Sequence, residues 1–414
     1  SLCIITNVFN KFKKITISLK KINYYQMLKK NYRVGILGLG YVGTPLLKNI
    51  LDKKIKVVGY DSSIVRINFL KRTKKKFSDY ISSNTKILKD CNIYLVCVPT
   101  PIDDKKKSNL KFLKDACLTI SKYIKKNDII IFESTVYPGV TKNFCLPLLK
   151  RNRNKEKLFY VGYAPERISP GLRKKNHNIS KIVAAENKKI GKKIKKFYEN
   201  FITNVYLVPK IEVAELAKNF ENCQRDLNIA LMNDLYMLCE KVDINPYEVI
   251  NACKTKWNFG NYYPGLVGGH CIGVDPYYLI EYAKKNNFQF RTLKISRQVN
   301  EKFVSDIKIK IKKFFIKKVI SKKDDILFIG GTYKKNTDDL RNSGALKIFK
   351  NISKVYKKSV LYDPHIITND IKLEKKYKAV IIMVFHDLIS KNNQVMKIIK
   401  NTQFVLDIFQ NLKK

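Results

Sequence analysis

Short apolar runs separated by helical patterns occupy the first part of the chain. The pattern predicts strands at Arg33–Leu37, Lys56–Tyr60, Ile93–Val98 and Ile129–Phe132, with a helix from Thr44 after the first strand. Strands that alternate with helices are typical of a parallel, doubly wound sheet. The first part of the chain is therefore predicted to be such an α/β domain.

The pattern changes after Pro209. Apolar residues at three- and four-residue spacing predict one long helix from Ile211 to Val242. A second alternation begins at Asp324, with strands predicted at Ile326–Ile329, Val360–Tyr362 and Ala379–Val384 and a Gly330-Gly331 turn after the first of them. The sequence therefore predicts a second, smaller α/β domain beyond a helical region.

Composition adds a strong positive charge to this picture. The 414 residues carry 82 Lys and Arg against 34 Asp and Glu, a formal charge of +48. A nucleic-acid or membrane-surface partner is one explanation, and solvated lysine spread over the whole surface is the other. We favour the second, because the excess is not gathered in one tract. No uninterrupted apolar run of about 18 residues indicates a membrane span.

The cysteines give no sign of a metal site. None of the nine forms a CxxC pair or zinc-type spacing, so no metal is expected, and most are interpreted as reduced core residues of a cytoplasmic protein. Residues 1–26, which precede Met27, are interpreted as an extension outside the fold.

A glycine-rich segment, GLGYVG at 38–43, follows the first predicted strand and opens a helix. Its glycines suit a tight turn and close approach to a pyrophosphate at the helix N-terminus. Asp61, 23 positions after Gly38, ends the second strand and would bind ribose hydroxyls, which favours NAD over NADP. Arg66 is near enough in the sequence to weaken this preference for NAD, because an arginine there can bind the 2′-phosphate of NADP. The alternative is a purely structural turn.

One cysteine, Cys271, lies in an unusual loop. The segment 264–279, PGLVGGHCIGVDPYYL, places four glycines around it and a carboxylate, Asp275, four residues later. Four glycines allow the backbone to press against a ligand. A nucleophile and a structural cysteine are both compatible with this pattern.

Two further segments carry candidate chemistry. One face of the long helix carries polar residues at three- and four-residue spacing: Glu215, Lys218, Asn222 and Arg225. This face is either a polar functional site or an ordinary solvated surface. The segment 164–171, APERISPG, carries Glu166 after a strand-like stretch, and its alternative is an ordinary polar loop.

In combination these segments resemble the UDP-glucose/GDP-mannose dehydrogenase family, over nearly all of residues 32–414. The matching motifs follow the family order: GLGYVG at 38–43, VPTP at 98–101, ESTVYPG at 133–139, APERISPG at 164–171, ELAKNFENCQRD at 215–226, GGHCIGVDPYYL at 268–279 and YKKNTDDLRNS at 333–343. Seven motifs in order are far more specific than any one of them.

The resemblance implies a fold of two Rossmann-like doubly wound parallel-sheet domains joined by a central helical domain with a long helix. The expected boundaries are an NAD-binding domain at 27–208, a central dimerisation domain at 209–301 and a UDP-sugar-binding domain at 302–414. A homodimer in the cytoplasm, with no membrane and no specific nucleic-acid partner, is expected.

The resemblance also implies a mechanism. NAD oxidises a sugar C6 alcohol to an aldehyde, Cys271 adds to it, a second hydride transfer gives a thioester, and water releases the uronate. A thiolate suits both steps because it is a strong nucleophile and a good leaving group. Lys218 and Asn222 would stabilise the oxyanion, and Asp275 would position Lys218 or water.

Further roles come from the matched motifs. Glu166 would be the general base for hydrolysis, and Thr135 would hold a water or the substrate hydroxyl. The cofactor contacts are expected at Gly38, Gly40, Tyr41, Val42, Gly43, Asp61, Arg66, Pro99, Thr100, Thr135, Lys334 and Arg341.

Within the family, the motifs look most like enzymes that oxidise UDP-N-acetylhexosamines for surface polysaccharides, UDP-N-acetyl-D-glucosamine in particular. Pro170 stands where the UDP-glucose enzymes often have a second glutamate, which counts against UDP-glucose. UDP-N-acetylgalactosamine, UDP-N-acetylmannosamine, UDP-glucose and GDP-mannose remain rival substrates. A basic nucleic-acid-binding protein and an inactive homologue are the rivals from other classes.

Overall fold

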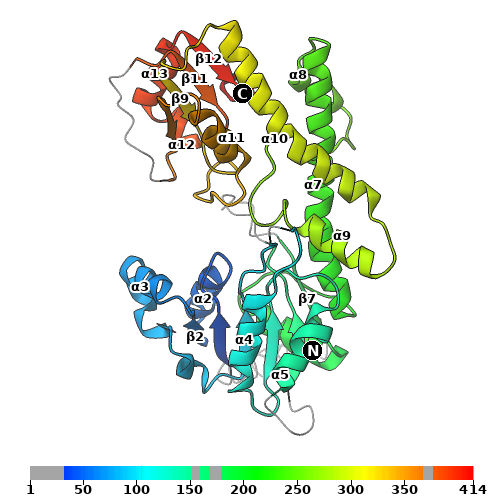
Figure 1. Cartoon of the computed structure of the whole chain (residues 1–414). Helices are drawn as coiled ribbons and strands as arrows, with labels where there is room; N and C mark the ends of the chain where they lie inside the picture. The colour runs from blue at the N-terminus through cyan, green and yellow to red at the C-terminus, as the bar shows by residue number, and fades with distance from the viewer. Residues whose placement is uncertain (1–31, 104, 152–158, 168–178, 367–375, 414) are drawn as a thin grey trace, which may run out of the picture. The chain divides into compact units, whose positions relative to one another are not determined.

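The computed structural model describes residues 32–103, 105–151, 159–167, 179–366 and 376–413. They form two compact units (Figure 1). The first unit contains the described residues up to Thr100 and those in 109–167 and 179–216. The second contains the described residues in 101–108 and those from Ala217 onward. The extension at 1–26 lies outside the described residues.

The first unit is built on an eight-stranded sheet in the order β3-β2-β1-β4-β5-β6-β7-β8. The strands are β1 Arg33–Leu37, β2 Lys56–Tyr60, β3 Ile81–Ser82, β4 Ile93–Val96, β5 Ile129–Phe132, β6 Tyr160–Tyr163, β7 Lys181–Ala185 and β8 Val205–Leu207. Strands β1 to β6 are parallel, in the doubly wound order, while β7 runs antiparallel to β6. Three predicted strands have the predicted bounds, and β4 ends two residues early.

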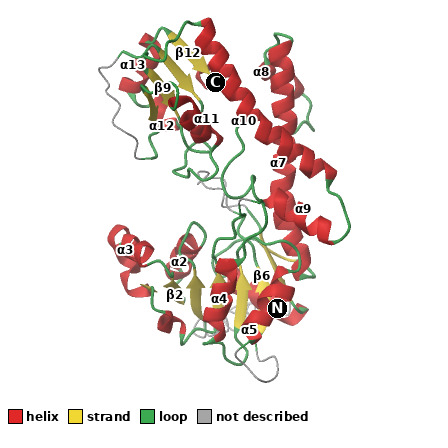
Figure 2. Cartoon of the chain, in the orientation of Figure 1, coloured by secondary structure: helices red, strands yellow, loops and turns green. Residues whose placement is uncertain are grey.

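Helices cover this sheet (Figure 2). They are α2 Gly43–Asp52, α3 Ile64–Thr73, α4 Lys111–Ser121, α5 Leu146–Lys150 and α6 Lys188–Tyr198, with the short π-helix η3 at Thr141–Cys145. Helix α6 has a buried face of Ile190, Ile194 and Phe197 while its lysines face outward, so its basic run is a solvated surface.

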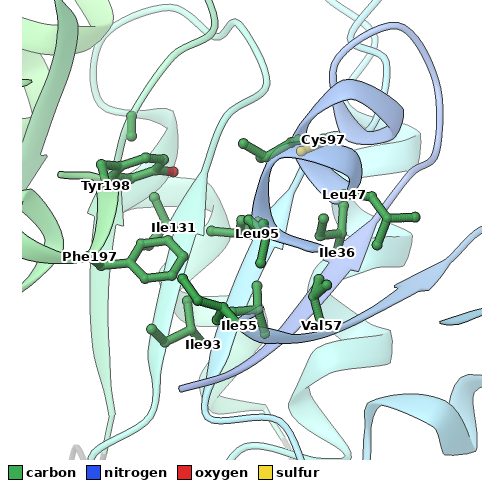
Figure 3. Packing of buried hydrophobic residues seen from close by; sticks show 14 of the residues in the cluster. Ile36, Leu47, Ile55, Val57, Ile93, Leu95, Cys97, Ile131, Phe197 and Tyr198 are labelled. Atoms are coloured by element: carbon green, nitrogen blue, oxygen red, sulfur yellow. The ribbon is translucent and has the colours of Figure 1, made fainter. Parts of the chain in front are cut away.

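The core of the first unit lies between these layers. Every residue of β4 is buried, which explains its continuous apolar sequence, since a central parallel strand has both faces covered. Figure 3 shows Ile93 and Leu95 of β4 in one cluster with Phe197 and Tyr198 of α6. The rings of Phe197 and Tyr198 meet edge to face at 5.2 Å.

Helix α7, Ile211–Lys241, begins in the first unit and continues into the second, which also contains α8 Pro246–Cys253, α9 Asp275–Lys285 and α10 Arg291–Lys317. The long helix was predicted to within one residue of its end. Helix α10 was not located from the sequence. It buries Phe303, Ile307, Ile311 and Phe315, one residue per turn, against the second sheet.

The second sheet has four parallel strands in the order β10-β9-β11-β12. The strands are β9 Ile326–Ile329, β10 Ser359–Tyr362, β11 Ala379–Ile382 and β12 Phe404–Asp407, with helices α11 Gly344–Ser353, α12 Asp387–Ser390 and α13 Asn393–Asn401. The predicted fold class, two parallel α/β sheets with a helical region between them in the chain, is confirmed. The domain boundaries at 208/209 and 301/302 stay predictions.

Within the described part of the chain, no helix is both long enough and apolar enough to cross a membrane.

Candidate active site

The glycine-rich loop at 38–43 joins β1 to α2, and the structure shows a steric reason for two of its three glycines. Gly38 has φ +91°, and a Cβ there would lie 2.8 Å from the Cys97 carbonyl oxygen. A Cβ on Gly43 would lie 1.9 Å from the Gly38 carbonyl oxygen, so this glycine allows helix and strand to pack closely. Around Gly40 no heavy atom of the described residues, apart from its two chain neighbours, lies within 4 Å of the Cβ position. Its open side is where a pyrophosphate could approach the backbone.

Asp61 and Arg66 both bind this loop. Asp61 Oδ2 accepts a hydrogen bond from Leu39 N at 2.8 Å, and Oδ1 accepts one from Ser63 N at 2.9 Å. Arg66 Nε donates to the Leu39 carbonyl oxygen at 2.8 Å. The structure therefore gives Arg66 a local role in holding the loop. Asp61 remains half-buried at the end of β2, where a ribose-binding carboxylate would lie.

The loops that follow β4 and β5 meet at the same edge of the sheet. Thr100 Oγ1 donates to the Thr135 carbonyl oxygen at 2.6 Å, and Ser134 Oγ donates to the Val98 carbonyl oxygen at 2.7 Å. The exposed Pro99 lies between these two bonds. Ligands of doubly wound sheets bind outside the carboxyl ends of the strands, so Pro99, Thr100 and Thr135 lie where a dinucleotide would be expected.

The Cys271 loop leads into α9 of the second unit. The Cys271 carbonyl oxygen accepts the backbone N–H groups of Val274 and Asp275, at 3.0 and 2.9 Å, in a tight turn. Cys271 is half-buried. The turn places Asp275 at the start of α9, where its carboxylate faces α7 through Asn222.

On α7, Lys218 and Asn222 are 7% and 5% exposed, and Glu215 is fully buried, so the solvated-face alternative is wrong for these three. Arg225 is exposed. Asn222 Nδ2 donates to Asp275 Oδ2 at 2.6 Å. Burial raises the pKa of Asp275 to about 6, although the Lys218 charge and the Asn222 hydrogen bond oppose the rise.

Two glycines of the cysteine loop press against protein rather than lying open. A Cβ on Gly268 would lie 2.7 Å from both the Tyr333 Cβ and the Asn342 carbonyl oxygen, and Gly269 has φ +78°. Gly269 N donates to the Arg341 carbonyl oxygen at 2.9 Å. The loop is thereby attached to segment 333–342, which brings Lys334 and Arg341 to the same region as Cys271. The Lys334 pKa is lowered by burial and by Arg225, against the influence of Cys271.

Arg341 is held in a fork by Asp339, with Nε to Oδ1 at 2.9 Å and Nη2 to Oδ2 at 2.7 Å. Its Nη2 also lies 2.8 Å from Nδ1 of His270, the residue before Cys271. Sequence reasoning assigned no role to His270 or Asp339, although both lie inside matched motifs.

The His270 contacts favour opposite protonation states. Burial lowers its pKa, but hydrogen bonds with Asp339 and Cys271 raise it to about 9, which favours the charged ring. A guanidinium nitrogen only donates, however, so the 2.8 Å contact with Arg341 requires Nδ1 to accept. Asp339 lies farther from Nδ1, at 3.5 Å. We favour the neutral ring in this arrangement because the shorter contact leaves no place for a proton on Nδ1.

Glu166 lies in the first unit, three residues after β6. Its Oε1 accepts the Arg167 backbone N–H at 2.7 Å, and its Oε2 lies 3.4 Å from the Lys181 ammonium. Lys181 also binds the buried Glu133. Sequence reasoning missed Lys181, and Glu133 was visible only as the first letter of ESTVYPG. Pro170 lies outside the described residues.

The structure therefore groups the predicted residues in two sets. Cys271, Lys218, Asn222, Asp275, Lys334 and Arg341 belong to the second unit, and Glu166, Thr135 and the glycine loop to the first. Among the described residues, no cluster of three or more His, Cys, Asp or Glu side chains could hold a metal ion.

Comparison with known proteins assigns three models of one family to the chain. They are the NAD binding domain at residues 32–202, the central domain at 212–302 and the UDP binding domain at 327–414 of the UDP-glucose/GDP-mannose dehydrogenase family.

Individual relatives span most of the chain. A UDP-N-acetyl-D-glucosamine 6-dehydrogenase of Salmonella typhi is 36% identical over 382 residues, 86% of this chain and 90% of the relative. A UDP-N-acetyl-D-mannosamine dehydrogenase of Methanocaldococcus jannaschii is 31% identical over 338 residues, 77% of this chain and 76% of the relative. The solved structure of the UDP-D-ManNAc dehydrogenase from Pyrococcus horikoshii matches with a TM-score of 0.81 at 29% identity, covering 90% of this chain and 94% of that one.

An NAD-binding fold combined with these relatives defines an NAD-dependent oxidoreductase that acts as a UDP-sugar 6-dehydrogenase. The chain belongs to the UDP-glucose/GDP-mannose dehydrogenase family.

Proposed function

We propose that this protein oxidises the C6 hydroxyl of a UDP-N-acetylhexosamine, UDP-N-acetyl-D-glucosamine first among them, to the carboxylate, as a step towards surface polysaccharide precursors. The relatives named for UDP-N-acetyl-D-glucosamine are 36% identical and those named for UDP-N-acetyl-D-mannosamine 29–31%. This difference supports the gluco epimer. The manno and galacto epimers and UDP-glucose remain the alternatives.

The observation that carries the mechanism is the buried Lys218–Asn222–Asp275 group connected to the Cys271 turn. An ammonium and an amide are seldom buried on a helix, because their burial costs free energy unless a charged or hydrogen-bonding partner compensates it. Asn222 is oriented by its 2.6 Å bond to Asp275, so its position is fixed before substrate arrives. Preorganised donors of this kind stabilise an oxyanion that develops on a substrate carbonyl.

Each residue of the site has its own role in the proposed reaction. The 38–43 loop would hold NAD, which would supply the hydride acceptor for each of the two oxidations. The Cys271 sulfur forms a bond to C6 of the aldehyde, while Lys218 and Asn222 hold the oxygen that becomes negative. Loss of the C6 hydride leaves a thioester on Cys271. Glu166 takes a proton from water, whose oxygen attacks the thioester and releases the uronate and the thiolate.

A homodimer is part of the proposal. Phe220, Leu227, Leu231 and Leu238 of α7 are 40–62% exposed and fall on one stripe at spacings of seven, four and seven. An exposed apolar stripe of this length is typical of an interface. Leu231→Asp is expected to shift the protein towards monomer in light scattering, whereas Asn251→Asp on the exposed side of α8 should not. Dimers that survive Leu231→Asp would contradict this surface.

A reducing compartment such as the cytoplasm suits the chain, because the eight described cysteines all carry free thiols.

The decisive experiment measures NADH release from the purified protein with UDP-N-acetyl-D-glucosamine and with the rival sugars. Two NADH per sugar are expected. Cys271→Ala should lower turnover by roughly 10⁴-fold or more. Cys253 is the other half-buried thiol among the described cysteines, and Cys253→Ala should leave turnover unchanged. A clear preference for UDP-glucose would refute the substrate assignment, and full activity of Cys271→Ala would refute the covalent mechanism.

A further inference from the structure

Two carboxylates and one ammonium meet at the carboxyl edge of the first sheet. Lys181 Nζ donates to Glu133 Oε2 and also contacts Glu166 Oε2 at 3.4 Å. The Lys181 and Glu133 side chains are 3% and 0% exposed, and that of Glu166 is 18% exposed. Tyr198 of α6, also buried, donates its hydroxyl to Glu133 Oε1.

The antiparallel direction of β7 brings Lys181 to the two glutamates. Glu133 follows β5 and Glu166 follows β6, so both lie where these parallel strands end. Lys181 is the first residue of β7, which runs antiparallel to β6 with Tyr163 opposite Ala184. The start of β7 therefore lies at the edge where β5 and β6 end. A parallel β7 would have placed Lys181 at the other edge.

Glu133 accounts for the burial of Lys181 but not for its second contact. An ammonium removed from water needs one ionised partner, and Glu133 with the Tyr198 hydroxyl supplies it. Burial raises the pKa of Glu133 above its usual range and the Glu166 charge adds to the rise, while Lys181 and the Tyr198 hydroxyl oppose it. Lys181 nevertheless reaches the more exposed Glu166. Arg167 binds the other oxygen of Glu166 through its backbone N–H, and Arg167 Nη1 donates to the Ser180 carbonyl oxygen at 2.6 Å.

We propose that Lys181, fixed by Glu133 and Tyr198, is a positioning residue that holds the Glu166 carboxylate for the hydrolysis of the enzyme thioester. This inference rests on the proposed function of Cys271 and Glu166. When both glutamates are ionised, the group carries one net negative charge. When Glu166 takes a proton from water, a neutral Glu133–Lys181 pair remains. Lys181 thus orients the base and keeps the proton uptake on Glu166.

The test separates hydrolysis from the two oxidations. Lys181→Met is mixed with NAD and UDP-N-acetyl-D-glucosamine, quenched in acid during turnover, and the protein mass and NADH are measured. Lys181→Met should release two NADH per Cys271 rapidly and then turn over about 10- to 100-fold more slowly than wild type. The fraction of protein carrying the acyl adduct should rise. Lys181→Arg, which keeps the charge and the donors, should restore most of the hydrolysis rate.

A purely structural role gives different results. If Lys181→Met slows NADH release and hydrolysis alike, or slows neither, the inference is wrong. If the variant does not fold because Glu133 loses its partner, the double variant Glu133→Gln/Lys181→Met removes the unpaired charge, and the same adduct accumulation is expected from it. A double variant without accumulation would also overturn the inference.

Glu166→Gln distinguishes this inference from the function on which it rests. Accumulation in Glu166→Gln but not in Lys181→Met rejects the role of Lys181 alone. No accumulation in Glu166→Gln rejects Glu166 as the base, and with it the reason for positioning it. Absence of any adduct in the wild type and in both variants, with NADH still formed, rejects the covalent mechanism itself.

Discussion

Gly40→Ala and Gly43→Ala add the same methyl group to the same loop, three residues apart, with opposite expected effects. At Gly40 no heavy atom of the described residues beyond its chain neighbours lies within 4 Å of the new Cβ, and φ is outside the left-handed region. Alanine there should leave the free protein as stable as before, or stabilise it by about 0.4–1 kcal/mol through the unfolded chain. At Gly43 the Cβ would lie 1.9 Å from the Gly38 carbonyl oxygen, so β1 and α2 must separate by more than 1 Å.

The open side of Gly40 is the side proposed for the NAD pyrophosphate. A methyl group forced into a filled space costs about 1–3 kcal/mol. This converts to a roughly 5- to 150-fold weaker NAD complex. Gly43→Ala should instead destabilise the free protein by a similar amount, because its clash exceeds the gain of about 1 kcal/mol from replacing glycine in a helix.

Thermal unfolding without ligand and NADH titration by fluorescence measure the two quantities separately. The expected pattern is unchanged stability with weak binding for Gly40→Ala, and reduced stability for Gly43→Ala. Wild-type NADH affinity in a folded Gly40→Ala variant would refute the assignment of this loop to the pyrophosphate. A loss of stability in Gly40→Ala would show that the space around Gly40 is needed by the protein itself.

Three further changes have expected outcomes. Asn233→Ala removes the two bonds that hold the Gly265 backbone, at 2.9 and 3.2 Å, and should cost about 2–3 kcal/mol in denaturant unfolding; a loss below about 0.5 kcal/mol would contradict this. Burial raises the pKa of Glu215 to about 7 from 4.5, so the folded state binds a proton that the unfolded chain has already lost. This group's contribution to the free energy of unfolding, about 3 kcal/mol, is therefore lost as the pH rises between those values. Glu215→Gln should remove that part of the pH dependence of stability, and an unaltered slope of stability against pH between 5 and 8 would argue against it. Arg341→Lys cannot reproduce the fork with Asp339, so the KM for NAD or for the UDP-sugar should rise with little change in unfolding, and unchanged steady-state constants would exclude a ligand role.

The local patterns of the sequence were sufficient for the long helix, the position of the glycine loop and most of the parallel strands, but not for β3 and β12. Strands β1, β2, β5 and β9 have the predicted bounds because buried parallel strands are continuously apolar and end at polar or glycine residues. The fingerprint glycines were readable because their spacing, between a strand and a helix, is itself a local pattern. Helix α10 was not predicted because its apolar face has only one residue per turn and lysines are frequent between these positions.

Asp61 and Asp363 illustrate what local pattern does not distinguish. Each follows the second strand of its own sheet. Asp363 is 1% exposed and accepts the N–H groups of Gly331 and Thr332 and a contact from His386 Nε2 at 2.9 Å. His386 Nδ1 accepts the Asn336 N–H, so its proton lies on Nε2 and is donated to Asp363. Both carboxylates therefore bind their own loops, but Asp363 is fully buried there, whereas Asp61 stays half-buried.

By itself, the sequence determined the two alternations of strands and helices, the long helix between them, the glycine-rich loop and the family motifs, because these depend on residues close together in the chain. Tertiary structure alone decided that Lys218 and Asn222 are buried and that Asn222 meets Asp275, 53 residues away. It also decided that Lys181 meets Glu133, 48 residues away, through the reversed strand β7. Burial and strand direction set the charge environment of these side chains, and both result from packing between distant segments that no local spacing encodes.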